Sequence, residues 1–300
     1  MRGENKTQKD NNTHLISKRF NNIKRNWYKF SRNPLSVIGL ITVIIVILIA
    51  IFAPYFSPYP ESAGKYVNFL EDSQPPSLSH LLGTDTFGRD ILSRIFYGSR
   101  ISLLMAAMVL LLVVPVGVIL GLLAGYHQGS WIDSLIMRIT DIFLALPPLV
   151  LALAICSILP PNLFNAMMAV CLMWWPWYTR LTYGIVSSLR VEFFVQAAEI
   201  SGAGTLHILF REILPNCIST ILTKMTLDVG FVILIASSLS FVGLGTQPPT
   251  PDLGSMVADG AKYLPEQWWI TVFPGIAIIL IVLAFNLLGD GIRDMFEEGA

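Results

Sequence analysis

The sequence predicts an all-α polytopic membrane protein with six transmembrane helices, because it is apolar, poor in charge and divided into long uncharged runs. Of its 300 residues, 54% are hydrophobic and only 13% are charged, against about 25% charged residues in an average soluble chain. This composition excludes a disordered chain and an ordinary cytosolic enzyme. The formal net charge of zero excludes a nucleic-acid binder driven by positive charge.

Six stretches are long enough to cross a bilayer, which takes about 20 mostly apolar residues. The first contains no charge, with Asn33 as its expected N-cap and Pro34 at its first helical position. Prolines inside the spans should kink their helices, as a helix bundle tolerates. The six expected spans are residues 35–53, 101–124, 135–159, 162–186, 221–245 and 269–288.

Positive charge before the first span sets the expected orientation. The positive-inside rule places the N-terminus in the cytoplasm, and six spans return the C-terminus to the same side. A cleaved signal peptide is the alternative, but the basic region is too long for one and no Ala-x-Ala site follows. The basic residues are Arg2, Lys6, Lys9, Lys18, Arg19, Lys24, Arg25, Lys29 and Arg32.

This orientation divides the chain into five expected parts. A cytoplasmic basic tail, which includes an amphipathic surface helix, precedes the first transmembrane helix. An external segment follows, then a transmembrane core that carries one cytoplasmic and one external loop, and finally a short cytoplasmic tail. The parts are residues 1–33, 34–54, 55–100, 101–290 (with loops at 187–220 and 246–268) and 291–300.

The amphipathic helix is expected from apolar residues that recur at helical spacing among basic ones. Such a pattern is typical of a helix lying on the inner membrane surface. A solvated tail is the alternative, above all for residues 1–13. The apolar residues are Ile16, Phe20, Ile23, Trp27 and Phe30.

The cytoplasmic loop at 187–220 is the most patterned part of the chain. Leu189, Phe193, Ala197 and Ile200 fall on one helical face, which predicts an amphipathic helix. A turn at two glycines should end it, before a second short helix at 205–210. A helix–turn–helix at a membrane surface suits docking into a groove on a partner protein. The alternative is an ordinary surface helix, because alanine has a high helix propensity.

The loop resembles that of a known family. Gln196-Ala197-Ala198, Gly202 and Leu214-Pro215 match the E-A-A-x-x-x-G…L-P loop of bacterial ABC-importer permeases. Two positions depart from the pattern: Gln196 replaces the leading acid, and Glu212 stands where isoleucine is common. The first change removes a charge that could contact an ATPase.

Further matches cover nearly the whole chain after residue 30. They resemble the dipeptide/oligopeptide/nickel branch of that family, and within it the second (C-type) of two paired permeases. The matching strings are Asn33-Pro34-Leu35, Leu82-Gly83-Thr84-Asp85 with Gly88-Arg89-Asp90, Ser93-Arg94 with Gly98-Ser99-Arg100, Arg138 with Asp141 and Pro147, residues 239–245 with Gln247-Pro248-Pro249, and residues 286–294.

The resemblance implies a type I ABC-importer permease fold with a cytoplasmic coupling helix, in the bacterial cytoplasmic membrane. It implies as partners a paralogous second permease, two cytoplasmic ATPases and an external substrate-binding protein. The residues expected to couple to the ATPase, with Pro215 in the first turn of the fifth span, are Gln196, Ala197, Ala198, Glu199, Gly202, Ala203, Gly204 and Pro215.

No cofactor is expected in this chain. It lacks the G-x-x-x-x-G-K-[ST] phosphate loop, so ATP and magnesium are expected on the partner ATPases, and this subunit is expected to be a transporter component without enzymatic activity. Four histidines and three cysteines form no metal-ligand pattern. No motif of a membrane protease is present.

Ionisable residues in spans are functional candidates by default. Arg138, Asp141 and Arg180 lie near the inner ends of their spans, and an ion pair that fixes helix packing is favoured over substrate contact. Asp228 lies about two turns into the fifth span, where it could face the translocation path. All four are candidates for a gate or for helix pairing.

The substrate class is open at this stage. Peptides are favoured as the broadest substrate class of the branch, and nickel, a metal chelate or a glutathione-like molecule is the alternative. A secondary transporter driven by an ion gradient is less favoured. It would need buried acids in discontinuous helices and repeated halves, and the sequence shows no such repeat.

Overall fold

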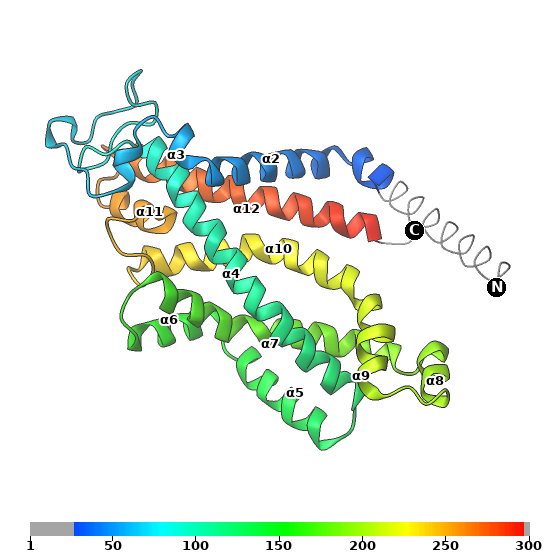
Figure 1. Ribbon diagram of the computed structural model, residues 1–300. Coiled ribbons are helices and arrows are strands. Elements are labelled where there is room, and N and C mark those ends of the chain that lie inside the picture. Colours follow the sequence, from blue (N-terminus) through cyan, green and yellow to red (C-terminus); the bar gives the residue numbers. More distant parts are fainter. Residues whose placement is uncertain (1–26, 297–300) are drawn as a thin grey trace, which may run out of the picture.

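The computed structural model describes residues 27–296, and within this range the chain is helical without any strand, with one isolated bridge between Thr84 and Asp90. The long loops lie at one end of the helix bundle, together with the short helices α3 (Ala53–Phe56) and α11 (Leu253–Ala261). The short helices α8 (Phe193–Ile200) and α9 (Thr205–His207) lie at the other end (Figure 1). The long helices are α2 (Pro34–Ile51), α4 (Ile91–Tyr126), α7 (Leu163–Leu189), α10 (Leu214–Phe241) and α12 (Trp268–Phe296).

The start of α2 confirms the expected cap. The side chain of Asn33 accepts a hydrogen bond from the Leu35 amide at 3.1 Å, and Pro34 follows at the first helical position. Residues 27–32 are also helical. Phe30 is buried there beside Gly291 of α12. The remainder of the expected amphipathic face, Ile16, Phe20 and Ile23, lies outside the described residues.

The number of spans differs from the six that the sequence predicts. Four helical runs of the described chain are long and apolar enough to cross a membrane, or five when one bent pair counts as a span. The difference lies in α7, which has 27 residues but carries three tryptophans and Arg180, and is therefore less apolar. The four runs are Pro34–Ile51, Ile91–Tyr126, Thr205–Phe241 and Trp268–Phe296.

The expected third span, residues 135–159, is two helices. α5 (Trp131–Leu144) and α6 (Pro148–Ile158) meet at an angle of 87°. Two consecutive prolines explain the break, because a residue that precedes proline is pushed out of the helical region. Pro147, with ψ at 126°, is that residue. The kink expected at the prolines of this span is thus a break between two helices, bent by 87°.

The second long helix begins ten residues before the expected span. The carboxylate of Asp90 caps α4 by accepting hydrogen bonds from the Ser93 amide (2.8 Å) and hydroxyl (2.6 Å). α4 therefore has 36 residues and a length of about 54 Å. It contacts α3 (Ala53–Phe56) and η1 (Pro60–Ala63), which lie with η2 (Phe69–Glu71) in the segment between α2 and α4.

Three glycines let α4 and α7 approach closely. Gly117, Gly121 and Gly125 recur every four residues along α4, the small-xxx-small spacing of closely packed membrane helices. A Cβ atom at Gly121 would lie 2.6 Å from the carbonyl oxygen of Thr179. At Gly125 it would lie 2.8 Å from Cβ of Val186. Only glycine therefore fits at these three positions of the α4–α7 contact, which we call the glycine seam.

A buried aspartate of α10 links this helix to α7. Asp228, 2% exposed, receives a hydrogen bond from the indole nitrogen of Trp174 and one from Nζ of Lys224, both at 2.9 Å. The Lys224 ammonium also lies 5.5 Å from the centre of the Tyr178 ring. Asp228 thus acts in helix packing, with its charge compensated by a residue one turn away on its own helix.

The glycine seam predicts opposite effects for one chemical change at two positions. Gly121→Ala should lower the free energy of unfolding by about 1–3 kcal/mol, because the added methyl group overpacks the seam. Gly184→Ala on α7 has nothing within 4 Å and should stabilise the helix by up to about 1 kcal/mol. Thermal unfolding of the detergent-purified variants measures both. Equal behaviour of the two would contradict the role of the seam.

The ion pair predicts partial rescue by a second substitution. Lys224→Met should lower the free energy of unfolding by about 3 kcal/mol, the low end of the range for breaking a buried pair, because the lysine side chain is 28% exposed. Adding Asp228→Asn, which keeps an acceptor for Trp174, should restore most of the loss. Denaturation of the two variants tests this, and additive losses would contradict it.

Candidate functional site

The short helices at the end opposite the external loops form the most distinctive surface of the molecule (Figure 1). α8 (Phe193–Ile200) follows α7 after a break at residues 190–192. A turn leads into α9 (Thr205–His207) and the π-helix η3 (Ile208–Ile213), which continues without interruption into α10. Only residues 190–204 therefore lie outside the two long helices, fewer than the expected loop of 187–220.

α8 is fixed to the helix bundle on one side. Val195 is fully buried, and Ile208, Leu209 and Ile213 of η3 are buried beneath it. The hydroxyl of Tyr126, at the end of α4, donates a 2.8 Å hydrogen bond to Glu199. α8 is thus attached both to the start of α10 and to the end of α4.

The turn after α8 is a Schellman motif with Gly202 at its centre. The Gly202 amide bonds to the Glu199 carbonyl at 2.9 Å, and the Ala203 amide bonds to the Ala198 carbonyl at 3.0 Å. Gly202 has φ of +79°, which favours glycine. Ala198 and Ala203 pack against the core. Gly204 then caps α9 from an extended conformation.

Pro215 lies at the first turn of α10, as the sequence predicts. The helix nevertheless begins earlier, at Thr205, because the preceding π-helix continues into it. Proline cannot donate to the carbonyl four residues before it and crowds that group. A π-type turn removes this conflict by shifting the local hydrogen-bond pattern.

The outward face of α8 is apolar and unpartnered. Phe193 is 85% exposed, Ile200 is 88% exposed and Leu206 of α9 is 70% exposed. Ala197 is exposed between them. The side-chain amide of Gln196 donates a hydrogen bond to the Val191 carbonyl at 2.9 Å. Three of the four apolar residues of the expected face therefore form one surface on α8, and it points away from the bundle. Leu189 belongs instead to the end of α7.

The remaining candidates lie apart from this surface. Asp141 of α5 pairs with Arg180 of α7, and both side chains are about half exposed, so the pair contributes at most about 1 kcal/mol. Arg138 lies on the exposed surface of α5. Asp228 is buried and pairs with Lys224, whose side chain is 28% exposed. The sequence reasoning missed Lys224, although an oppositely charged residue four positions away in a span was the available signal.

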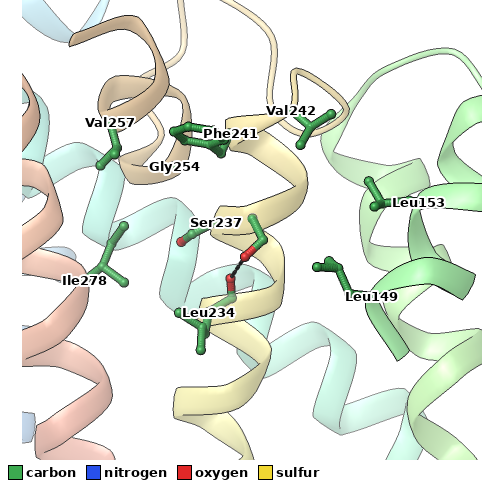
Figure 2. Close-up of a pocket in the computed structure, with 10 residues that line it drawn as sticks. Leu149, Leu153, Leu234, Ser237, Phe241, Val242, Gly254, Val257 and Ile278 are labelled. Carbon is green, nitrogen blue, oxygen red and sulfur yellow. Dashed lines mark hydrogen bonds between the residues drawn. The ribbon is translucent and has the colours of Figure 1, made fainter. Parts of the chain in front are cut away.

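An apolar cavity of about 380 Å³ opens among α6, α10, α12 and the external helix α11 (Leu253–Ala261). Figure 2 shows Leu149 and Leu153 of α6 on one side and Val257 and Ile278 on the other. The hydroxyl of Ser238 donates a hydrogen bond to the Leu234 carbonyl at 2.8 Å. The walls of the cavity therefore offer few polar groups to a ligand.

Metal-binding residues do not gather anywhere in residues 27–296. This range contains no group of three or more histidine, cysteine, aspartate or glutamate side chains that could hold an ion. The three cysteines are free and buried.

The fold resembles a solved membrane transporter. The methionine ABC transporter MetNI in its inward-facing conformation aligns with a TM-score of 0.53 over 69% of this chain and 96% of that chain, at 15% identity. At that identity the likeness concerns the fold alone, and it agrees with the type I importer fold that the sequence predicts.

Family comparisons and relatives agree on a narrower group. Residues 117–300 match the family described as binding-protein-dependent transport system inner membrane component, and residues 22–76 match the N-terminal TM domain of oligopeptide transport permease C.

Curated relatives match over almost the entire chain. The di/tripeptide transport system permease protein DppC of Pseudomonas aeruginosa is 41% identical over 92% of this chain and 91% of its own length. The dipeptide transport system permease protein DppC of Escherichia coli K12 is 44% identical over 90% and 91%. The glutathione transport system permease protein GsiD of Pectobacterium atrosepticum is 40% identical over 90% and 89%. The chain therefore belongs to the inner membrane permeases of binding-protein-dependent ABC importers, in the oligopeptide permease C branch.

Proposed function

We propose that this chain is one of two different permeases that together carry peptides across the bacterial cytoplasmic membrane. Two ATPases on the inner side bind ATP and magnesium, and an external binding protein delivers the peptide. The relatives named above support peptides, since several are permeases of dipeptide or tripeptide systems. Both termini of this subunit lie in the cytoplasm, in keeping with the basic residues before α2.

The observation that carries this proposal is the exposed apolar face of α8. Phe193, Ile200 and Leu206 would each gain about 1.5–3 kcal/mol by burial in a groove of another protein. Large apolar side chains that are grouped and exposed mark interaction sites. The face lies at the inner end of the bundle, where an ATPase docks. Gln196, Ala197, Ala198, Glu199, Gly202, Ala203 and Gly204 frame this coupling surface.

The attachment of α8 explains how force reaches the membrane. Buried contacts fix α8 to η3, which continues through Pro215 into α10, and a hydrogen bond fixes it to α4. When the ATPases close on ATP, α8 moves inward and rotates these helices together. A shift of the equilibrium from 1:99 to 99:1 takes about 5.5 kcal/mol of differential binding. Alternating access follows from such a rigid connection.

The ionisable residues have a secondary part in this proposal. Arg180 and Asp141 hold α7 against α5, and Asp228 holds α10 against α7 through Trp174. Arg138 is free to contact the second permease. We assign these residues to helix pairing during the movement rather than to contact with substrate.

Two alternatives differ from this proposal, one in the substrate and one in the energy source of transport. The importer could carry nickel, a metal chelate or a glutathione-like molecule, since the binding protein makes most of the selection. An ion gradient could replace ATP. Uptake into vesicles that contain the complete complex, with labelled dipeptide, nickel or glutathione in separate arms, separates the substrates. Inactivating the ATPase separates the energy sources.

The apolar face predicts loss of the ATPases from the complex. Affinity purification from gently solubilised membranes should recover two ATPase chains and a second permease with the natural protein. Phe193→Ala with Ile200→Ala should reduce the retained ATPase at least tenfold, because two buried apolar side chains are lost. Phe164→Ala with Ile158→Ala is the matched control at the external end, where both side chains are also exposed. Recovery of the natural chain alone would contradict the proposal.

The turn at Gly202 predicts a transporter that folds but does not work. Gly202→Asp should still be expressed, because the added Cβ atom meets nothing within 4 Å and aspartate is among the residues that tolerate a positive φ, yet ATP-driven dipeptide uptake should be abolished. The reason is a charged side chain placed on the docking surface. Gly129→Asp is the control, because Gly129 also has a positive φ and an open surrounding. Normal uptake by Gly202→Asp would refute the coupling role.

A further inference from the structure

The external end of the molecule contains a second cavity, of about 420 Å³, between the external segment and the loop after α10. This volume is within the usual range of small-molecule sites, about 300–1,000 Å³. Its charged lining residues are Lys65, Arg89, Arg94 and Asp259. The cavity thus combines three cationic side chains with one anionic side chain, unlike the apolar cavity of Figure 2.

Arg94 is the most unusual of these residues. It belongs to the first turn of α4, and only 5% of it is exposed. One terminal nitrogen donates to the Ser62 carbonyl at 3.1 Å, while Nε has no hydrogen-bond partner and lies 3.5 Å from the carboxylate of Asp85. A buried charge that is incompletely paired is unfavourable. An anion in the adjoining cavity would compensate it.

Arg89 adds a second guanidinium on the same wall. Its Nε donates to Asp85 at 2.8 Å, and its guanidinium carbon lies 4.6 Å from the centre of the Phe87 ring. These two contacts fix the group in place. The two terminal nitrogens of Arg89 remain able to donate hydrogen bonds to a ligand. Asp85 lies against both arginines, 2.8 Å from Nε of Arg89 and 3.5 Å from Nε of Arg94, so one carboxylate is shared by two guanidinium groups.

Asp259 provides a negative charge in the same cavity. It projects from α11 and is paired on the surface with Lys262 at 3.3 Å. Both side chains are more than 60% exposed, so the pair is weak and another cation can replace Lys262. α11 separates the two cavities, with Ser255 and Asp259 on the external one and Gly254 and Val257 on the apolar one.

We propose that this cavity binds the charged ends of a small peptide, with Arg94 and Arg89 binding the carboxylate and Asp259 the ammonium group. This inference rests on the proposed function, since a free dipeptide carries both charges within one small molecule. A zwitterion matches a cavity lined by both cationic and anionic side chains better than an acidic side chain of a partner protein, which would leave Asp259 opposed by a like charge. The site would hold the peptide at the external entrance, beside α11.

The test uses the purified complete transporter without its external binding protein. Binding of labelled alanyl-alanine is compared with binding of the same dipeptide carrying a C-terminal amide. The amide should bind at least tenfold more weakly, because it loses the charge-assisted hydrogen bonds to the arginines. Equal binding of the two peptides, or no binding of either, would overturn the proposal.

Two pairs of variants locate the site. Arg94→Gln should weaken binding of the free dipeptide at least tenfold, whereas Arg100→Gln, on the same helix but outside this cavity, should not change it. Asp259→Asn should weaken it several-fold, and Glu266→Gln, an exposed external acid outside the cavity, should not. If Arg94→Gln fails to fold, two measurements still test the proposal. One compares the free and the amidated dipeptide on the natural protein, and the other compares Asp259→Asn with Glu266→Gln.

A third arm separates the peptide from a protein partner. If no free peptide binds but Arg94→Gln weakens association of the external binding protein, the site belongs to that protein and our proposal is wrong. Dipeptide uptake by the complete complex is measured in parallel. Uptake without external binding overturns only this inference, whereas absence of dipeptide uptake overturns the proposed function itself.

Discussion

Inside a bilayer no hydrophobic force drives two helices together, so close packing of backbones must hold them. Gly117, Gly121 and Gly125 supply that packing between α4 and α7, where added Cβ atoms would lie under 3 Å from the opposite helix. α7 needs this support because its tryptophans and Arg180 make it less apolar than the other long helices. Once α4 and α7 are joined, α10 packs on both, and α12 and α2 follow. The positions of both functional surfaces depend on this arrangement.

The two ends of the molecule differ in charge and in exposed apolar surface. At one end α8 and α9 present phenylalanine, isoleucine and leucine outward, a surface suited to a groove on another protein. At the opposite end arginines and an aspartate line a cavity, a surface suited to a small charged molecule. Between them the described cavity is apolar. The charged ends of a ligand would therefore find few polar or oppositely charged side chains in this part of the chain. This agrees with a path that a second permease completes.

Continuity of the helices explains how these ends communicate. η3 joins α8 to α10 without a break, and Pro215 is accommodated by the π-type pattern just before it. α10 ends close to α11, which borders both the apolar and the external cavity. In the proposed function, a movement of α8 would be transmitted through η3 and α10 to α11, the helix that separates the two cavities. The hydrogen bond from Trp174 to Asp228 connects α10 to α7 along this route.

The sequence by itself determined the helical membrane fold, the cap at Asn33, the glycine turn at Gly202 and the family, because apolar run length, capping chemistry and positive φ are local properties. It did not determine the size of the bend at the consecutive prolines of the span at 135–159, which is 87°. It also could not choose the partners of the charged side chains, because those partners lie on other helices. Asp141 pairs with Arg180 of another helix, and Asp228 is buried against Trp174. The face of α8 points outward because Val195, on its other side, fills the core. Only the tertiary structure could choose between the two faces, since both are apolar.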